Sequence, residues 1–433
     1  MPNDLAIPLK ALCATVIDGT LDYPRFSEEQ LVRLYNILSE QRDALAEAAA
    51  KDTGVTKVEA QLEVAEALKH VKGLAEQASE VASRLKDEKK AVLSGESKLE
   101  RGKGVVVVFQ SPTGPFYSVI APLATAIVTS NAVVCLLSSS TSSVSLLLQT
   151  ILRTTLDRFA YLFLIDKDSS SVISALQKKL SIVVVWESPT SVDADPAKAI
   201  LSTSSGADGA IALVDRLEKP SSVSAIAHLL VRGKQHALGR LPGSVSRVFV
   251  HEDSSGALAD AVLAECKSAY GKEDPKLLID SFASHEEALV KFKQLNSTAI
   301  YVFSDDPLTG EYLAKESLVS TTYINDVPLS ALYDPHRALT TRSHYTTLSS
   351  LIRAPLPSSS PCSSDPSSHL ALLSASLPAR LEWTRKPHSN TIRRVFFLQG
   401  VFISVGTVLT VLLGATVWGA WLAATYVRRK YFV

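Results

Sequence analysis

Between Ser27 and Leu85 the apolar residues recur every three or four positions, which is the spacing of helices with one buried face. One helix is predicted to begin at Ser27, because Ser27 and Gln30 have the form of a capping box. A second is predicted from Val58 to about Leu85, where the charged stretch KDEKK follows. Two long amphipathic helices are therefore expected near the N-terminus.

From Gly104 onward the pattern changes to short, uninterrupted apolar runs that alternate with helical stretches. Such runs are typical of strands that are buried on both faces of a parallel sheet. In chain order they are GVVVVF (104–109), NAVVCLL (131–137), AYLFLI (160–165), SIVVVW (181–186), IALV (211–214), SRVFVH (246–251) and STAIYVFS (297–304). The alternation indicates βαβ units, and hence an α/β protein in which a three-layer domain precedes a second α/β domain.

The C-terminal part has neither pattern. The stretch APLPSSSPCSSDPSS (354–368) is rich in Pro and Ser and is predicted to be a linker. Positions 395 to 427 are 33 residues without a charge, whereas about 20 apolar residues suffice to cross a bilayer. A transmembrane helix is expected there. A buried core helix is the alternative, although this run exceeds the usual length of a globular helix.

The position of this apolar segment indicates a tail anchor. Only a basic tail, 428–433, follows it, and the N-terminus lacks the features of a signal peptide. The N-terminal part is therefore expected to remain in the cytosol, with the endoplasmic reticulum favoured and the mitochondrial outer membrane as the alternative. The expected organisation is 1–205 for the N-terminal helices and first α/β domain, 206–330 for the second, 331–394 for the linker and juxtamembrane segment, 395–427 for the span and 428–433 for the tail.

Charge and cysteine content exclude several classes of protein. The 44 basic residues balance the 44 acidic ones, so no bulk electrostatic attraction to nucleic acid is expected. The four cysteines lie far apart without metal-ligand spacing, which argues against a zinc site or a disulfide framework. Cys135 and Cys266 are predicted to be buried packing residues, whereas Cys13 and Cys362 fall in stretches predicted to be irregular.

Residues 104–134, GVVVVFQSPTGPFYSVIAPLATAIVTSNAVV, carry a family resemblance. They are similar to the aldehyde dehydrogenase superfamily, whose cofactor domain has a strand, Pro-Trp-Asn-x-Pro-Phe, a Pro-Leu helix and Gly-Asn-x-Val-x-x-Lys-Pro-Ser-Glu. The matching positions are Pro112, Pro115, Phe116, Pro122, Leu123, Asn131, Ala132, Val133 and Val134. The resemblance extends over roughly 25–327, and the C-terminal apolar segment is reminiscent of the fatty aldehyde dehydrogenase branch. It implies a Rossmann-type domain, a second α/β domain and oxidation of aldehydes with NAD(P) by a cysteine nucleophile and a glutamate base.

The chain departs from the family at the reacting groups. Aligned on the family pattern, the nucleophile position falls on Pro242, whose side chain has no nucleophilic atom. Nearby hydroxyls belong to Ser244 and Ser246, and His236 is the neighbouring base in sequence, so a serine nucleophile remains an alternative. The glutamate base falls on Ser205 or Asp208, depending on the placement of a gap, and Asp208 is also consistent with a simple turn.

The groups that hold the cofactor in the family also change. The oxyanion-hole asparagine aligns with Thr113 or Gly114, and the lysine and glutamate that contact the ribose align with Leu136 and Ser139. Glu187 aligns with the loop that contacts the cofactor pyrophosphate in the family. A carboxylate about 4 Å from a phosphate would oppose cofactor binding by about 4 kcal/mol per charge pair. The resemblance, taken together with these changes, implies that the protein does not bind NAD(P).

Two functions from different classes are therefore expected. The first is a membrane-anchored, aldehyde dehydrogenase-like pseudoenzyme, without assigned catalytic, cofactor or metal residues, that acts in binding, scaffolding or regulation. Its partners would be the lipid bilayer and a homo-oligomer or hetero-oligomer with an active family member, but not nucleic acid. The second is an active NAD(P)-dependent oxidoreductase that acts on fatty or other long-chain aldehydes. A third interpretation, a decaying or mis-spliced gene, remains open.

Overall fold

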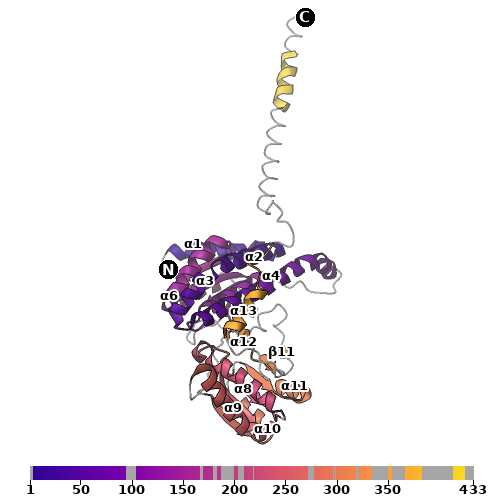
Figure 1. Ribbon diagram of the computed structural model, residues 1–433. Helices are drawn as coiled ribbons and strands as arrows, with labels where there is room; N and C mark the ends of the chain where they lie inside the picture. Colours follow the sequence, from indigo (N-terminus) through magenta and orange to yellow (C-terminus); the bar gives the residue numbers. More distant parts are fainter. Residues whose placement is uncertain are drawn as a thin grey trace, which may run out of the picture. The chain divides into compact units, whose positions relative to one another are not determined.

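The computed structural model describes most of the chain (Figure 1). The described residues are 3–93, 104–165, 169–178, 183–186, 199–202, 209–217, 219–271, 277–295, 297, 299–317, 321–333, 350–353, 366–382 and 413–424. The chain divides into two units, Met1–Glu382 and Trp383–Val433, and the first of these contains both sheets.

Helices form the N-terminal part of the first unit. They are α1 (Asn3–Ile17), α2 (Pro24–Glu40), α3 (Arg42–Thr53) and α4 (Lys57–Leu93). The predicted start at Ser27 is wrong, because α2 begins at Pro24, where a residue without an amide N–H loses no hydrogen bond. The prediction for Cys13 is also wrong: this residue lies buried in α1, a helix that contains Pro8 and lacks a clear helical pattern.

The first sheet has five parallel strands in the order β3-β2-β1-β4-β5. The strands are β1 (Val105–Phe109), β2 (Ala132–Leu137), β3 (Tyr161–Ile165), β4 (Val183–Trp186) and β5 (Ala199–Ser202), and the helices between them are α5 (Tyr117–Val128), α6 (Ser142–Thr155) and α7 (Ser169–Gln177). Strands β1 to β4 were predicted from their apolar runs. These runs form a continuous core, in which α5 packs on β1 and β2. This order is that of a doubly wound, Rossmann-type sheet.

The second sheet has six parallel strands in the order β11-β10-β9-β6-β7-β8. Its strands are β6 (Ala210–Val214), β7 (Val245–His251), β8 (Leu278–Phe282), β9 (Ile300–Phe303), β10 (Thr321–Ile324) and β11 (Ser350–Arg353). Its helices are α8 (Pro220–Gln235), α9 (Glu252–Tyr270), α10 (His285–Lys293), α11 (Pro307–Glu316) and α12 (Leu329–Tyr333), with a 3₁₀ turn, η3 (His236–Gly239), after α8. The predicted α/β class and its parallel sheets are thus confirmed.

The segment predicted as a linker contains regular structure. Strand β11 extends the second sheet beyond position 330, and α13 (Pro366–Ser376) packs against α4. Of the predicted span 395–427, the structure describes only 413–424, which are helical. Among the described residues, every helix is too short or too polar to span a bilayer.

Candidate functional site

The loop that carries Pro242 lies between η3 and β7, directly against α12. The Gly243 amide donates a hydrogen bond to the Leu332 carbonyl at 2.9 Å. A Cβ atom on Gly243 would lie 2.0 Å from the Ala331 carbonyl oxygen. Backbone therefore meets backbone beside Pro242, and only a glycine allows this approach.

The loop that carries Thr113 and Gly114 lies at the same place. A Cβ atom on Gly114 would lie 3.2 Å from the Tyr333 ring and 3.5 Å from a Leu241 methyl group. Thr113 is held within its own loop, because its hydroxyl lies 2.9 Å from the hydroxyl of Ser111. The structure thus brings together the positions that the resemblance assigns to the oxyanion hole and to the nucleophile.

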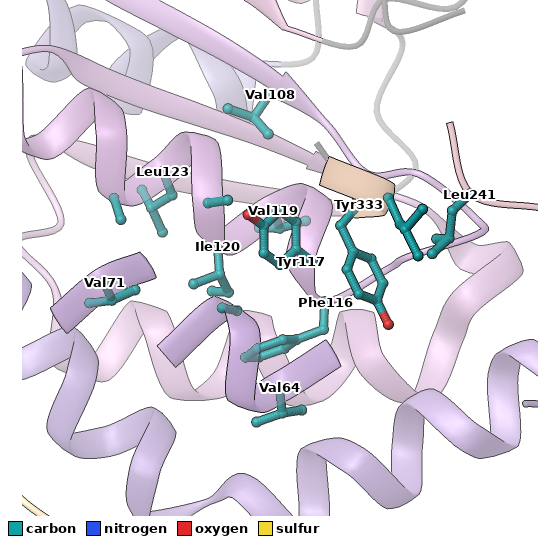
Figure 2. Packing of buried hydrophobic residues seen from close by; sticks show 14 of the residues in the cluster. Val64, Val71, Val108, Phe116, Tyr117, Val119, Ile120, Leu123, Leu241 and Tyr333 are labelled. Atoms are coloured by element: carbon teal, nitrogen blue, oxygen red, sulfur yellow. The ribbon is translucent and has the colours of Figure 1, made fainter. Parts of the chain in front are cut away.

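Tyr333 lies where these two loops meet, and Figure 2 shows its ring beside Tyr117 and near Leu241. Its ring stacks on Tyr117 at 5.1 Å between centroids and meets His236 edge-on at 5.6 Å. Only 5% of Tyr333 is exposed. Burial, with the charges of nearby glutamates, raises the pKa of Tyr333 well above its ordinary value, so its hydroxyl stays protonated. The space is therefore occupied by an aromatic side chain of the chain itself.

His236 is not placed to activate a serine. Its Nε2 lies 2.8 Å from the Tyr333 hydroxyl, and its Nδ1 lies 4.0 Å from a carboxylate oxygen of Glu59. The Ser246 hydroxyl donates to the Ala210 carbonyl at 3.1 Å, and the Ser244 hydroxyl is buried without a hydrogen-bond partner. Burial lowers the pKa of His236 to about 4, against the opposing effect of Glu59. The ring nitrogens of this neutral imidazole thus face Tyr333 and Glu59, so His236 is not the base for either serine.

A buried carboxylate caps the helix that follows β1. The amides of Phe116 and Tyr117, at the N-terminus of α5, both donate to Glu63 Oε1 at 2.8 Å. Burial raises the pKa of Glu63 to about 7, although these two hydrogen bonds act in the other direction. In a βαβ unit this helix terminus is suited to a phosphate, because its amides point outward without partners. Here the protein supplies the anion from α4.

The carboxyl ends of β1 and β2 are tied together by Gln110. Its side-chain amide donates to the Pro115 carbonyl at 3.0 Å, and its oxygen accepts from the Ser138 amide at 2.8 Å. Leu136 is buried at the end of β2, and Ser139 opens a short 3₁₀ turn. These two positions hold neither the cation nor the carboxylate that the family directs to the ribose, so the residues at these positions do not fit the ribose of NAD(P). Glu187, Ser205 and Asp208 lie outside the described residues.

A polar cluster that the sequence did not predict lies at the carboxyl edge of the second sheet. Asp215, at the end of β6, accepts from the Ser304 hydroxyl at 2.8 Å and contacts His285 Nε2 at 2.8 Å. The aspartate stands between the other two, so the serine hydroxyl does not face the imidazole. Ser304 is also 1% exposed, and Pro242 lies at the opposite, amino end of the strands. This cluster therefore does not form a nucleophile and base for the predicted site.

One cavity in the described part of the chain, of about 450 Å³, lies away from Pro242 and is lined by Arg247, Asp280 and Lys291 on β7, β8 and α10. The described residues include no group of three or more His, Cys, Asp or Glu side chains that could hold a metal ion.

Comparison with known proteins agrees with the fold. Residues 26–179 match the aldehyde dehydrogenase family. AldH from Staphylococcus aureus, solved in a substrate-bound state, superposes with a TM-score of 0.57 at 16% identity, over 76% of this chain and 86% of that one. An NAD-dependent aldehyde dehydrogenase from Sinorhizobium meliloti gives 0.59 at 14% identity, over 75% and 79%. A mutant aldehyde dehydrogenase C from Pseudomonas syringae, complexed with NAD+ and octanal, gives 0.58 at 10%, over 75% and 82%.

No curated protein sequence matches the chain. Identities this low establish the fold alone. The protein therefore has an α/β fold of the aldehyde dehydrogenase type, and its residues 26–179 are similar to the aldehyde dehydrogenase family.

Proposed function

We propose that this protein is a membrane-anchored, non-catalytic aldehyde dehydrogenase-like protein that acts by binding, scaffolding or regulation. The observation that supports this most strongly is the position of Tyr333. It occupies the space between the Gly114 loop and the Pro242 loop, where an aldehyde would have to meet a nucleophile. The two backbone amides at the start of α5 likewise donate to Glu63, a side chain of the protein itself.

The same proposal includes an anchor at 395–427. The described part of this segment, 413–424, is a helix whose side chains are exposed all round, and Trp418 and Val417 are 66% and 68% exposed. Apolar side chains on every side of a helix are suited to lipid. We propose a cytosolic N-terminal part and a location at the endoplasmic reticulum, with the mitochondrial outer membrane as the alternative. The partner would be a second copy or an active member of the aldehyde dehydrogenase family.

A second candidate function is NAD(P)-dependent oxidation of long-chain aldehydes. The match of residues 26–179 to the family favours it, and so does the likeness to enzymes solved with NAD+ and with octanal. It requires a nucleophile other than Pro242, and cofactor contacts that Leu136 and Ser139 do not supply. The pyrophosphate position of the family falls on Glu187, which lies outside the described residues.

Restoring a thiol alone is expected not to restore activity. The Pro242→Cys variant would supply the nucleophile, but Tyr333 would still fill the adjacent space and the cofactor contacts would still be absent. Purified full-length variant, incubated in detergent with octanal and NAD+ or NADP+, is expected to form no reduced nicotinamide above the wild-type background at 340 nm. An active aldehyde dehydrogenase in the same detergent is the control. Turnover by the variant would support the second candidate function.

A further inference from the structure

Residues 377–382, which follow α13, lie on helix α2. The Tyr35 hydroxyl donates to the Pro378 carbonyl at 2.6 Å, and the Ser39 hydroxyl donates to the Ala379 carbonyl at 3.0 Å. Asn36 bonds Leu381 twice: its amide donates to the carbonyl at 3.2 Å, and its oxygen accepts from the backbone amide at 2.8 Å. Three side chains on two adjacent turns of α2 thus hold the backbone of one irregular segment.

The preceding helix is held by α4. Leu373 of α13 is 6% exposed and belongs to the main hydrophobic core. Lys72 donates to the Ser376 carbonyl at 3.2 Å, at the C-terminal end of α13. Leu377 and Leu381 also pack against this core. Apolar contacts and hydrogen bonds therefore act together along 366–382, which we call the docked segment.

The docking is specific, because side chains of α2 satisfy backbone groups that belong to no helix or strand. An irregular backbone satisfies its polar groups through side chains or water. Asn36 uses both its donor and its acceptor on one residue, as a neighbouring strand would. Burial raises the pKa of Tyr35 to about 12, so its hydroxyl remains a donor at physiological pH.

We propose that the docked segment is a latch that sets how far the folded unit can move from the bilayer. From Glu382 to Val395 is 395 − 382 = 13 residues, which span at most about 45 Å when fully extended. If the segment were released, the preceding described element would be β11, which ends at Arg353, and the 395 − 353 = 42 residues that follow span at most about 145 Å when fully extended. This inference rests on the proposed anchor at 395–427.

The latch defines the kind of partner that the protein can bind. With the segment docked, the folded unit is restricted to proteins whose binding surfaces lie close to the same membrane. Once released, the folded unit can reach partners about three times farther from the membrane. The contacts are individually weak, because a neutral hydrogen bond within the protein replaces hydrogen bonds to water and adds little net stability. A competing ligand for the α2 face could therefore open the latch.

The test uses the full chain in nanodiscs of phosphatidylcholine and phosphatidylserine. Asn36→Ala and Tyr35→Phe are combined, and Arg33→Ala, on an exposed side chain of the same helix, is the matched control. Hydrogen exchange of the backbone amides at 379–382 is expected to rise at least tenfold in the double variant and to stay unchanged in the control. Unfolding temperatures of both variants establish that the folded unit is intact.

Reach is measured in the same particles. A fluorophore is attached through Gly256→Cys, a position on α9 where a side chain meets nothing within 4 Å, in a chain that carries Cys362→Ser. Energy transfer to a lipid-bound acceptor is expected to fall in the double variant. The latch proposal would be overturned if hydrogen exchange at 379–382 is unchanged in the double variant. It would also be overturned if this exchange rises while energy transfer to the lipid-bound acceptor stays the same. If the wild-type chain fails to float with liposomes, the anchor itself is wrong, and the reach function falls with it.

Discussion

Replacing Gly243 by alanine is expected to destabilise the folded unit by about 3 kcal/mol. The added Cβ would lie 2.0 Å from the Ala331 carbonyl oxygen and 2.8 Å from the Leu332 Cα, and both are backbone atoms that cannot rotate away. Helix α12 would have to move, and Tyr333 would leave the space beside the Pro242 loop. Urea unfolding followed by circular dichroism measures the loss.

The matched control is Gly256→Ala in α9, where the new Cβ would meet nothing within 4 Å. That substitution is expected to stabilise the chain by roughly 0.5 to 1 kcal/mol, because alanine is the better helix former. Equal stability of the Gly243→Ala variant and the wild type would contradict the close packing of α12 on this loop.

Glu63 and His236, two buried groups of the first unit, are expected to change the stability of the protein with pH in opposite directions. Glu63 has a pKa of about 7 when folded, against 4.5 as the ordinary value, so the folded state binds its proton more tightly. The stability due to Glu63 therefore falls as the pH rises from about 4.5 to about 7. His236 has a pKa of about 4 when folded, against 6.5, so the unfolded state binds its proton more tightly. The stability due to His236 therefore rises between about pH 4 and 6.5.

Each pKa differs from its ordinary value by about 2.5, which corresponds to about 3 kcal/mol of unfolding free energy. The two contributions change with pH in opposite directions, so they largely cancel in the wild type. Glu63→Gln keeps an oxygen for the Phe116 and Tyr117 amides and removes the falling slope. Its stability relative to the wild type is expected to increase by about 3 kcal/mol from pH 4.5 to 7. The stability of His236→Gln relative to the wild type is expected to decrease as the pH rises from about 4 to 6.5. Unfolding free energies measured at half-unit steps across this range test both, and parallel curves for the three proteins would refute the account.

The strands of both sheets were predictable where their apolar runs are continuous. GVVVVF and AYLFLI became β1 and β3 because a strand buried on both faces needs no polar positions. β8 was missed because it is an edge strand with an exposed, mixed pattern, as at Leu278 and Asp280. α1 was missed because its proline and its uniformly apolar composition conceal a helical period.

The alignment placed Pro242 and Gly114 at one site, and the structure brings their loops together. What occupies that site could not be predicted. Glu63 caps α5 across 53 residues of sequence, and Tyr333 contacts His236 across 97. Such contacts depend on the packing of α4 and α12 and leave no local pattern. The only available signal was negative, namely the absence of the cysteine and of the cofactor-binding residues.

The most direct test of the central claim is a calorimetric titration of NAD+ and NADP+ into the full-length protein in detergent, with an active aldehyde dehydrogenase as the positive control. If Tyr333 fills the substrate space and Leu136 and Ser139 cannot hold the ribose, neither dinucleotide gives saturable heat up to millimolar concentration. Saturable binding with micromolar affinity would contradict the account.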